Sequence, residues 1–336
     1  VVKIKVADVF LKELKNVSVS AVFDKDQKKV IEYSKIFNCD KSQNINDFFR
    51  QDFDICYIST DSGSHYKNIL DCFKNNKHVV VEKPPVLKVN QLIQLDKIAR
   101  KKKLHFYVIY QNRENKAVEY VKKYLVKNNK EKITFVNLKL LWCRMQNYYS
   151  RWHGKWKTDG GVLAQQGIHS VDLLCHFFGK PIQSVSLMRN VSNKLQAEDT
   201  NAGLIKFKKV DCTYCLTTAL RPKDLGASIE IFMQKRVIKL GGLCCNELSI
   251  HNYDNSQKKL LEKISKKNSQ KVKNGVGVSH TKCFKEIIKK MQKQKANPLK
   301  AIETLETLKL INMLYKSNEE NRWVKNNKKI SSRLGN

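Results

Sequence analysis

Proline and glycine are scarce in this sequence, and apolar residues form no long run. Only 5 prolines and 13 glycines occur among 336 residues, a composition that excludes a collagen-like chain and a low-complexity linker. No apolar stretch approaches the roughly 18 residues of a membrane-spanning helix. We therefore expect a globular chain with no membrane partner, long enough for two domains.

Acidic residues are also few, at 31 against 64 lysines and arginines, which gives a formal charge of +33. Such a surplus suits nucleic acid, an anionic membrane surface or a phosphorylated small molecule. The lysines are spread through nearly every segment, and the sequence has no helix-turn-helix, zinc-finger or stacked-aromatic RNA motif. The distribution favours an ordinary solvated surface, and a basic nucleic-acid-binding protein stays open as an alternative.

The ten cysteines lie mostly inside apolar strand-like or helix-like patterns, as Cys56, Cys72 and Cys175 do. They are typical of small buried apolar residues rather than of a disulfide framework. Cys212 and Cys215 form a C-x-x-C, but in a strand this spacing puts the two side chains on opposite faces. We expect no metal site there and, since no signal peptide is visible, a cytoplasmic protein.

The first third of the chain alternates β-branched apolar runs with amphipathic helices. The expected strands are 17–23, 54–59, 77–81 and 104–110, and the expected helices are 65–75 and 89–103. This alternation is the pattern of a parallel sheet with crossover helices. It predicts an α/β domain over residues 1–112.

After Asn112 the pattern changes. Helices are expected at 114–127, from Gly160-Gly161 to about Phe178, at 282–294 and at 298–317, and strands at 133–145 and in six consecutive runs between 182 and 253. Strands without intervening helices indicate an antiparallel sheet. The sequence predicts an α+β domain over 113–336, with a linker-like stretch at 256–274.

Asp24 follows the first expected strand. A carboxylate at the end of the second strand of a dinucleotide-binding unit accepts hydrogen bonds from the adenosine ribose and disfavours a 2′-phosphate. The G-x-G-x-x-G loop should precede it by about 20 residues, which falls on Val1 to Val6, where there is no glycine. Because the sequence begins with Val1, we expect that a first strand and its glycine loop are missing by truncation.

The run Glu82-Lys83-Pro84 follows a buried strand, at the edge of the sheet where ligands bind in doubly wound folds. A lysine there can donate a hydrogen bond to a substrate hydroxyl and favour its ionised form. On spacing alone, an ordinary surface lysine is an equally open reading.

Gln165, His169 and Asp172 are spaced i, i+4 and i+7, so on one helix they share a face. Polar groups in register after a Gly-Gly entry make His169 a candidate general base. The alternative is an ordinary histidine whose hydrogen bonds are satisfied in the core or at the surface. His176 follows on the same face, but the segment lacks a zinc ligand set.

Together these motifs resemble the Gfo/Idh/MocA oxidoreductases, the family of glucose-fructose oxidoreductase and inositol dehydrogenase. The resemblance covers nearly the whole chain and rests on five features: Asp24, Thr60 with His65, Glu82-Lys83-Pro84, Gly160-Gly161, and Gly167-Ile168-His169 followed by Asp172. The stretch from Trp152 to Gln166 is more similar to the branch that acts on nucleotide-linked acetamido sugars and their uronates.

The resemblance implies an N-terminal Rossmann domain, a C-terminal α+β domain with a mainly antiparallel open sheet, and a nicotinamide cofactor bound between them. Asp24 favours NAD over NADP as that cofactor. It makes Lys83 the active-site lysine and His169 the acid/base histidine. Substrate contacts are expected from Gln165, Asp172 and Trp152. Cofactor contacts are expected from Asp24, Thr60, His65, Glu82, Lys83 and Pro84.

Two departures from the family pattern affect this reading. Gln165 stands where the family commonly has Asp or Asn, and Thr60-Asp61 replaces Thr-Pro. An amide orients a sugar hydroxyl but cannot share a proton, so the acid/base work would fall on His169 alone. The resemblance also implies a dimer or tetramer formed through the outer sheet faces.

These observations predict an oxidoreductase that moves a hydride between nicotinamide and a hydroxyl-bearing carbon of a sugar or nucleotide sugar. The absent glycine loop leaves a catalytically inactive scaffold protein of the same fold as an alternative.

Overall fold

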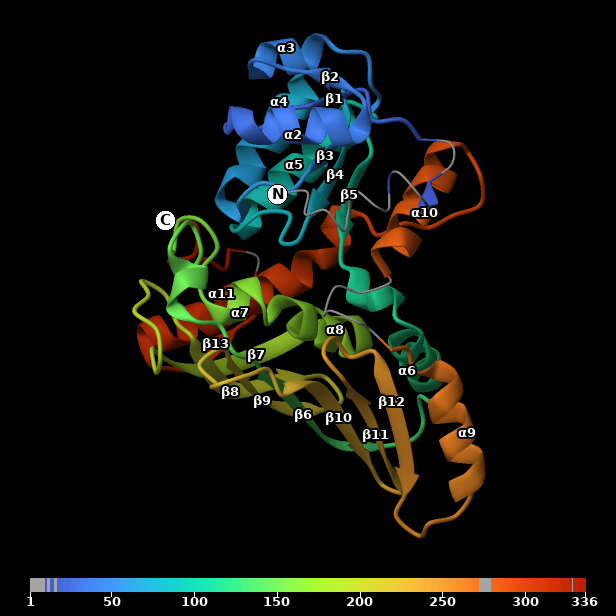
Figure 1. Cartoon of the computed structure of the whole chain (residues 1–336). Helices are drawn as coiled ribbons and strands as arrows, with labels where there is room; N and C mark the ends of the chain where they lie inside the picture. The colour runs from blue at the N-terminus through green and yellow to red at the C-terminus, as the bar shows by residue number, and fades with distance from the viewer. Residues whose placement is uncertain (1–9, 11–12, 15–16, 272–278, 328) are drawn as a thin grey trace.

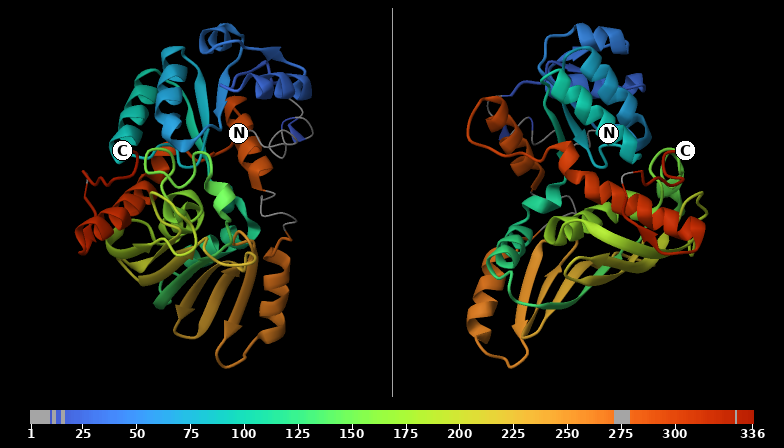
Figure 2. Two further views of the ribbon diagram at one scale, coloured as in Figure 1. Left: turned by 60° about the vertical axis from the view of Figure 1, so that its left-hand side comes forward. Right: turned by 180° about the vertical axis from the view of Figure 1, so that it is seen from behind.

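The structure is a computed structural model that describes residues 10, 13–14, 17–271, 279–327 and 329–336. It has two lobes, the first built from the N-terminal third of the chain and the second from a large sheet with its helices (Figures 1 and 2). The glycine-loop position expected at Val1 to Val6 lies outside the described residues.

The first lobe contains a parallel three-stranded sheet in the order β3-β4-β5 and a separate parallel pair, β1 with β2. Its strands are β1 (Ala21–Val22), β2 (Asp40–Lys41), β3 (Ile55–Ile58), β4 (His78–Glu82) and β5 (Phe106–Ile109). Its helices are α2 (Gln27–Phe37), α3 (Ile45–Arg50), η2 (Ser62–Ser64), α4 (His65–Lys74) and α5 (Val89–Lys101). This confirms the α/β prediction, although the strand expected at 17–23 is only two residues long.

Local sequence explains where the first helices begin and end. The carboxylate of Asp26 accepts a hydrogen bond from Lys28 N at 3.1 Å and caps α2. Asn38 ends that helix in the left-handed conformation, which asparagine tolerates better than most residues. Asn44 caps α3 through Asn46 N and Asp47 N.

The second lobe is built on an eight-stranded sheet in the order β12-β11-β10-β6-β9-β8-β7-β13. Its strands are β6 (Ile133–Leu141), β7 (Pro181–Arg189), β8 (Thr200–Phe207), β9 (Asp211–Thr217), β10 (Gly226–Met233), β11 (Arg236–Gly241), β12 (Glu247–Asn252) and β13 (Val324–Lys325). All recorded pairs in this sheet are antiparallel except β6 with β9. The mainly antiparallel sheet expected from the sequence is therefore confirmed.

One face of this sheet packs against helices. On β10, Ala227, Ile229 and Ile231 are buried in alternation with half-buried neighbours, as a strand with one covered face requires. At β7, Ser186 donates to Leu314 O at 2.6 Å and ties the sheet to α11 (Leu305–Glu320). The other helical segments of this lobe are η4 (Gln146–Tyr149), α6 (Lys116–Lys127), α7 (Val162–Gln165), α8 (Ile168–Phe178), α9 (Lys258–Asn268) and η5 (Ala301–Thr304).

Two expectations about helices were wrong. The helix expected from Gly161 to Phe178 is broken into α7 and α8 at Gly167, whose amide donates to Val162 O, and a side chain at Gly167 would meet Leu216 of β9 at 2.6 Å. The stretch 256–274, expected as a linker, contains α9, which packs along β12. The many lysines of α9 make its short apolar stripe around the buried Leu261 hard to recognise in the sequence.

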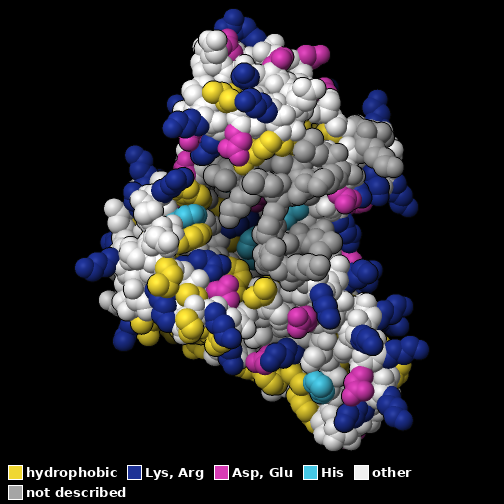
Figure 3. Space-filling view, in the orientation of Figure 1, with side chains coloured by type: hydrophobic (Ala, Val, Ile, Leu, Met, Phe, Trp, Pro, Cys, Tyr) yellow, Lys and Arg dark blue, Asp and Glu magenta, His cyan; other side chains and the backbone are white. Residues whose placement is uncertain are grey.

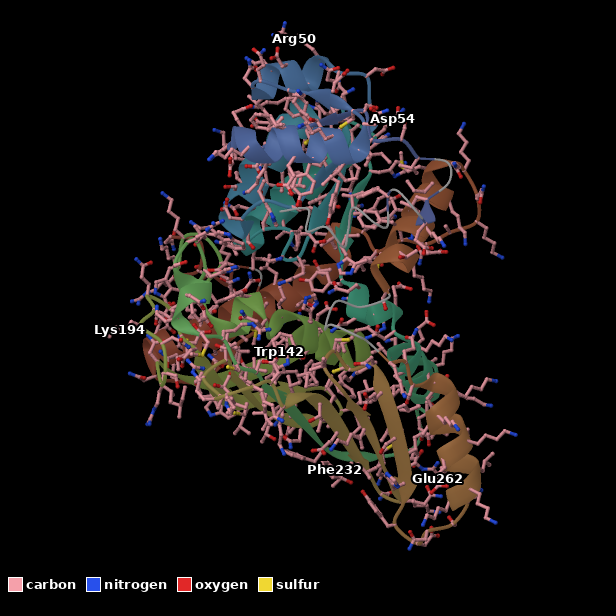
Figure 4. The ribbon with its side chains drawn as sticks, viewed as in Figure 1. Arg50, Asp54, Trp142, Lys194, Phe232 and Glu262 are labelled. Carbon is pink, nitrogen blue, oxygen red and sulfur yellow. The ribbon has the colours of Figure 1, made fainter. Side chains whose placement is uncertain are left out.

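The chain passes from the first lobe to the second through η3 (Gln111–Glu114) and returns through α10 (Ser279–Met291). Phe284 of α10 packs edge-on against Tyr57 of β3, with ring centroids 5.2 Å apart. Farther on, Leu299 O accepts a hydrogen bond from Val108 N. In Figure 4, Phe232 and Glu262 lie at the end of the sheet remote from the first lobe, whereas Trp142 lies nearer the boundary between the lobes.

Candidate active site between the two lobes

Lys83 joins the two lobes. It follows β4 directly, and its ammonium group donates to the main-chain oxygen of Gln165 at 2.6 Å and to Gln165 Oε1 at 2.8 Å. Gln165 is the last residue of α7. The structure thus brings together two residues that the sequence nominated separately.

His65 connects the two loops that flank this contact. Its ring nitrogens face two carbonyl oxygens, Pro84 O at 2.7 Å from Nδ1 and Thr60 O at 3.2 Å from Nε2. A neutral ring has one N–H, and the shorter contact identifies Nδ1 as the donor. The ring is only 1% exposed, and this burial lowers the pKa of His65. His65 therefore donates to Pro84 O through Nδ1, and its unprotonated Nε2 lies near Thr60 O without a hydrogen bond to it.

Glu82 receives a hydrogen bond from Tyr57 OH at 2.6 Å, and its carboxylate lies 3.8 Å from Nε2 of His280. Burial, followed by the charge of Glu82, raises the pKa of Tyr57, so the phenol stays protonated and donates. His280 comes from α10. The returning helix thus adds a histidine beside the Glu82-Lys83 segment.

His169 lies near the start of α8. Burial is the main cause that lowers its pKa well below the usual histidine value, and the positive charges of Lys83 and His280 lower it further. Its buried Nδ1 has no hydrogen-bond partner among the described residues. Tyr110 contacts the ring edge-on at 6.3 Å between centroids. A neutral imidazole beside an ammonium group is in the right state to accept a proton.

Asp172 is committed to two partners inside the second lobe. Arg113 binds its carboxylate through two hydrogen bonds, Nε to Oδ2 at 2.7 Å and Nη2 to Oδ1 at 2.6 Å, and Thr307 donates to Oδ1 at 2.8 Å. Asp172 is 1% exposed. The break before α8 places Asp172 and His169 on a different helix from Gln165, so the shared face expected for the three residues does not form.

A tight contact brings the loop after β3 against the second lobe. Gly63 N donates to Thr158 O at 2.7 Å, and a side chain at Gly63 would lie 2.3 Å from Lys157 O. Only glycine permits this approach. The loop that carries Thr60 is thereby fixed against the segment from Trp152 to Asp159.

This segment contributes an aromatic and polar cluster that the sequence did not nominate beyond Trp152. The ring of Trp152 contacts that of His153 at 3.7 Å between centroids, and Tyr148 stacks on the His153 ring at 4.2 Å. His153 Nδ1 lies 2.6 Å from Asp159 Oδ2 and 3.1 Å from Gln165 Nε2. The cluster therefore extends the Lys83–Gln165 contact into the second lobe.

Glu198 lies beneath α7 and is 2% exposed. Its Oε1 accepts from Leu163 N at 3.0 Å and from Tyr315 OH at 3.1 Å, and its main-chain oxygen accepts from Val162 N. Burial raises the pKa of Glu198 to about 8. A side chain at Gly161 would lie 2.2 Å from Glu198 O, so the close approach of Glu198 requires glycine at this position.

Asp24 lies just after β1, with its side chain about one third exposed. Oδ1 accepts from Asp26 N at 2.9 Å, and Lys29 Nζ lies 3.8 Å from Oδ2. The side chain of Thr60 also has a partner within the first lobe, since its hydroxyl oxygen accepts a hydrogen bond from Asn68 Nδ2 at 3.0 Å.

Five residues of this region could not be found from spacing: Arg113, His153, Asp159, Glu198 and His280. Each reaches the site from a segment distant in sequence or lies in a loop. The one sequence feature that could have pointed to them is an acidic residue or histidine within an aromatic-rich or apolar run. Within the described part of the chain, no group of three or more His, Cys, Asp or Glu side chains is arranged to hold a metal ion.

Comparison with known proteins identifies the class. Residues 5–110 match the family described as "Oxidoreductase family, NAD-binding Rossmann fold", and residues 123–325 match "Oxidoreductase family, C-terminal alpha/beta domain". The chain therefore belongs to the Gfo/Idh/MocA oxidoreductases, as its motifs predicted.

Individual relatives have low sequence identity to this chain. Scyllo-inositol 2-dehydrogenase (NADP(+)) IolW of Bacillus subtilis is 26% identical over 161 residues, which is 48% of this chain and 43% of that enzyme. The chain thus spans less than half the length of this curated relative.

Two solved structures share the fold over nearly the whole chain. The WlbA dehydrogenase of Bordetella pertussis, in complex with NADH and UDP-GlcNAcA, has a TM-score of 0.87 at 21% identity and covers 96% of this chain and 93% of its own. WlbA of Chromobacterium violaceum, with the same two ligands, has a TM-score of 0.86 at 24% identity, with coverage of 96% and 92%.

Proposed function

We propose that this protein is an NAD(H)-dependent dehydrogenase that acts on a CH–OH group of a sugar or nucleotide sugar. The observation that carries the proposal is the meeting of Lys83, from the nicotinamide-binding lobe, with Gln165 of the second lobe, near a neutral His169. Because residues 5–110 match an NAD-binding Rossmann fold, we place the contact between substrate and nicotinamide at this meeting of the two lobes.

The chemistry follows from the charges of the two residues. His169 takes the hydroxyl proton, the ammonium of Lys83 stabilises the developing alkoxide, and the hydride passes from the carbinol carbon to C4 of nicotinamide. Gln165 holds Lys83 in place and supplies no proton. Residues 1–112 would bind the cofactor and residues 113–336 the substrate.

For the substrate we favour a nucleotide sugar. The WlbA structures were solved with UDP-GlcNAcA, and this chain has an aromatic and cationic cluster in the corresponding lobe. Arg144 lies 4.9 Å from the ring centre of Trp142 and 5.8 Å from that of Tyr148, and the indole nitrogen of Trp142 has no partner among the described residues. With Trp152 and Gln165 these groups could stack on and hydrogen-bond a ligand. Because the carboxylate of Asp172 accepts hydrogen bonds from Arg113 and Thr307, we propose that Asp172 has a structural role and does not contact the substrate.

For the cofactor we favour NAD. Asp24 would accept hydrogen bonds from a free ribose 2′-hydroxyl and repel a 2′-phosphate, although Lys29 at 3.8 Å offsets part of that repulsion. IolW, by its name, uses NADP(+), so cofactor choice varies among relatives. In a fluorescence titration the full-length protein should bind NADH at least about tenfold tighter than NADPH, a difference of about 1.4 kcal/mol. Asp24→Ala should narrow the gap, and equal affinities in the unaltered protein would refute the role of Asp24.

We also propose a homo-oligomer that forms through the outer face of the large sheet. Val185, Leu187 and Leu204 share that face by register, and Leu187 is 68% exposed. An apolar face of this kind favours contact with a second copy. Leu187→Glu with Leu204→Glu should convert the oligomer into monomers in light scattering, while a monomeric unaltered protein would contradict this.

The cytoplasm is the compartment that we propose. All ten cysteines are free thiols, most of them buried, which suits a reducing environment. No helix among the described residues has the length and hydropathy needed to cross a bilayer. Figure 3 shows lysine and arginine side chains spread over both lobes on the face in view, and we include neither nucleic acid nor a membrane among the partners.

The proposal is tested by adding NAD and a panel of nucleotide sugars, free sugars and inositols to the full-length protein and following NADH formation. Turnover with any of them supports a dehydrogenase. The preferred substrate shows whether the protein belongs with the nucleotide-sugar branch or with the inositol dehydrogenases. Tight NADH binding without turnover would favour an inactive scaffold. Salt-sensitive binding of nucleic acid without NADH binding would favour the basic binding protein.

A further inference from the structure

Four polar side chains, beginning with Lys83, form a hydrogen-bonded chain that extends into the second lobe. Lys83 Nζ donates to Gln165 Oε1 at 2.8 Å, Gln165 Nε2 lies 3.1 Å from His153 Nδ1, and His153 Nδ1 lies 2.6 Å from Asp159 Oδ2. The inference drawn from it rests on the proposed function in one respect, that Lys83 is the active-site lysine.

The direction of this chain is fixed at the lysine end. An ammonium group has only donors, so the amide atom that faces Lys83 must be the oxygen. The NH₂ group of Gln165 therefore faces His153. An N–H on His153 Nδ1 would set two donors against each other, so Nδ1 is better placed as an unprotonated acceptor.

An unprotonated Nδ1 in turn decides the state of Asp159. A carboxylate has only acceptors and would face the lone pair of Nδ1 at 2.6 Å, which is repulsive. A protonated Oδ2 donates to that nitrogen instead. The other oxygen, Oδ1, already accepts from Gly154 N at 2.9 Å. One donating and one accepting oxygen is what a neutral carboxylic acid provides.

The surroundings of Asp159 agree with a neutral acid. The side chain is 1% exposed, and burial, the largest influence, raises the pKa of Asp159, although the charge and hydrogen bond of His153 and the hydrogen bonds from Gly154 and Lys155 lower it. The ion pair recorded for it within the described residues is with His153. Its acidic neighbour Glu198 is buried too, and the negative charge of Asp159 would raise the pKa of Glu198. Tyr148, whose pKa burial raises, covers the face of the imidazole.

We propose that Asp159 is a protonated acid that donates to His153 and, through His153, keeps the amide oxygen of Gln165 turned toward Lys83. Asp159 and His153 are thus positioning residues for the lysine. If Asp159 were ionised and Nδ1 carried the proton, the Gln165 amide would be drawn to turn its oxygen toward His153. Lys83 would then lose one of its two bonds to Gln165.

Two substitutions at Asp159 distinguish this arrangement from an ordinary histidine–carboxylate pair. Asparagine has one donating and one accepting group, so Asp159→Asn can serve both Nδ1 of His153 and Gly154 N. Asp159→Ala serves neither. If Asp159 were a carboxylate that accepts from both N–H groups, asparagine would fit only after His153 moved its proton from Nδ1 to Nε2, a change that the nitrogen NMR of the unaltered protein and of Asp159→Asn would reveal.

The expected result is a loss in kcat of roughly 10- to 100-fold in Asp159→Ala, the range for one hydrogen bond to a charged group. Asp159→Asn should recover most of that loss, with NADH affinity unchanged in both. Asp211→Asn, at an exposed aspartate at the start of β9, controls for the change of chemistry. An Asp159→Asn enzyme as slow as Asp159→Ala would overturn the proposal.

A second readout does not depend on activity. Nitrogen NMR of protein labelled in histidine, with His153→Gln used for assignment, reports whether Nδ1 of His153 carries a proton. We expect an unprotonated Nδ1 at neutral pH in both the unaltered protein and Asp159→Asn. A protonated Nδ1 would overturn the inference even if the dehydrogenase reaction is confirmed, and an unprotonated one supports it even if no sugar is turned over.

Discussion

Lys83 and Gln165 lie 82 residues apart in the sequence and are joined by two hydrogen bonds from one ammonium group. The acceptors are the main-chain and side-chain oxygens of Gln165, so the end of α7 holds the lysine at two points. A glutamine suits this position because its amide oxygen accepts from a cation without adding a negative charge. The departure from the family's Asp or Asn is thus compatible with a working lysine.

Replacing Lys83 should slow the chemical step more than it weakens cofactor binding. Lys83→Met removes the charge that stabilises the alkoxide, and loss of one such group costs roughly 10²–10³-fold in kcat. Steady-state kinetics and NADH titration measure the two effects, with the exposed Lys97→Met as the control. An unchanged kcat with lost NADH affinity would make Lys83 a cofactor contact only.

The pH dependence of the reaction should report His169. Because burial, Lys83 and His280 all lower its pKa, the base is neutral at neutral pH, and the acid limb of kcat/KM should fall below the usual histidine value of about 6.5. Lys83→Met removes one positive neighbour and should move that limb to higher pH. His169→Ala should lower kcat by roughly 10²–10⁴-fold and remove the limb. An acid limb above 6.5 in the unaltered enzyme would exclude this assignment.

Arg113→Met should destabilise the second lobe. It leaves the carboxylate of Asp172 buried without the two hydrogen bonds from Arg113, and breaking a buried pair costs about 3–5 kcal/mol. Urea unfolding measures the loss, and Arg50→Met, at a surface pair, is the control. The double variant Arg113→Met with Asp172→Leu should recover part of it. A stable single variant with impaired substrate binding would restore Asp172 as a substrate contact.

Glu198 should make the folded state less stable as the pH rises. Its pKa is about 8 in the folded protein and in the usual glutamate range when unfolded. The folded state therefore binds more protons between these values, and the free energy of unfolding falls there by up to about 1.4 kcal/mol per pH unit. Below the usual range the contribution is fully present. In urea titrations at several pH values, Glu198→Gln should flatten this dependence, and an equal slope in both proteins would contradict the account.

The sequence was sufficient for the two-part fold because periodicity is local. The strand before Glu82 and the alternation along β10 needed no tertiary information. The sequence did not predict the break between α7 and α8, where Gly167 packs closely against Leu216, a residue of β9 that is distant in sequence. Lys83 and His169 were nominated by motif, but His280 comes from a helix that returns from the far end of the chain. The pairing of His153 with Asp159 depends on a loop geometry that no period encodes.

The central claim is hydride transfer between nicotinamide and a sugar carbon, and isotope transfer tests it most directly. The full-length protein would be incubated with NADH deuterated at C4 of the nicotinamide and with keto derivatives of UDP-GlcNAcA and related sugars, and the products analysed by mass spectrometry and NMR. The account predicts that the unaltered protein places deuterium on one carbon of the sugar. His169→Ala should form much less of this deuterated product. Bound NADH with no deuterium transferred to any sugar would contradict it.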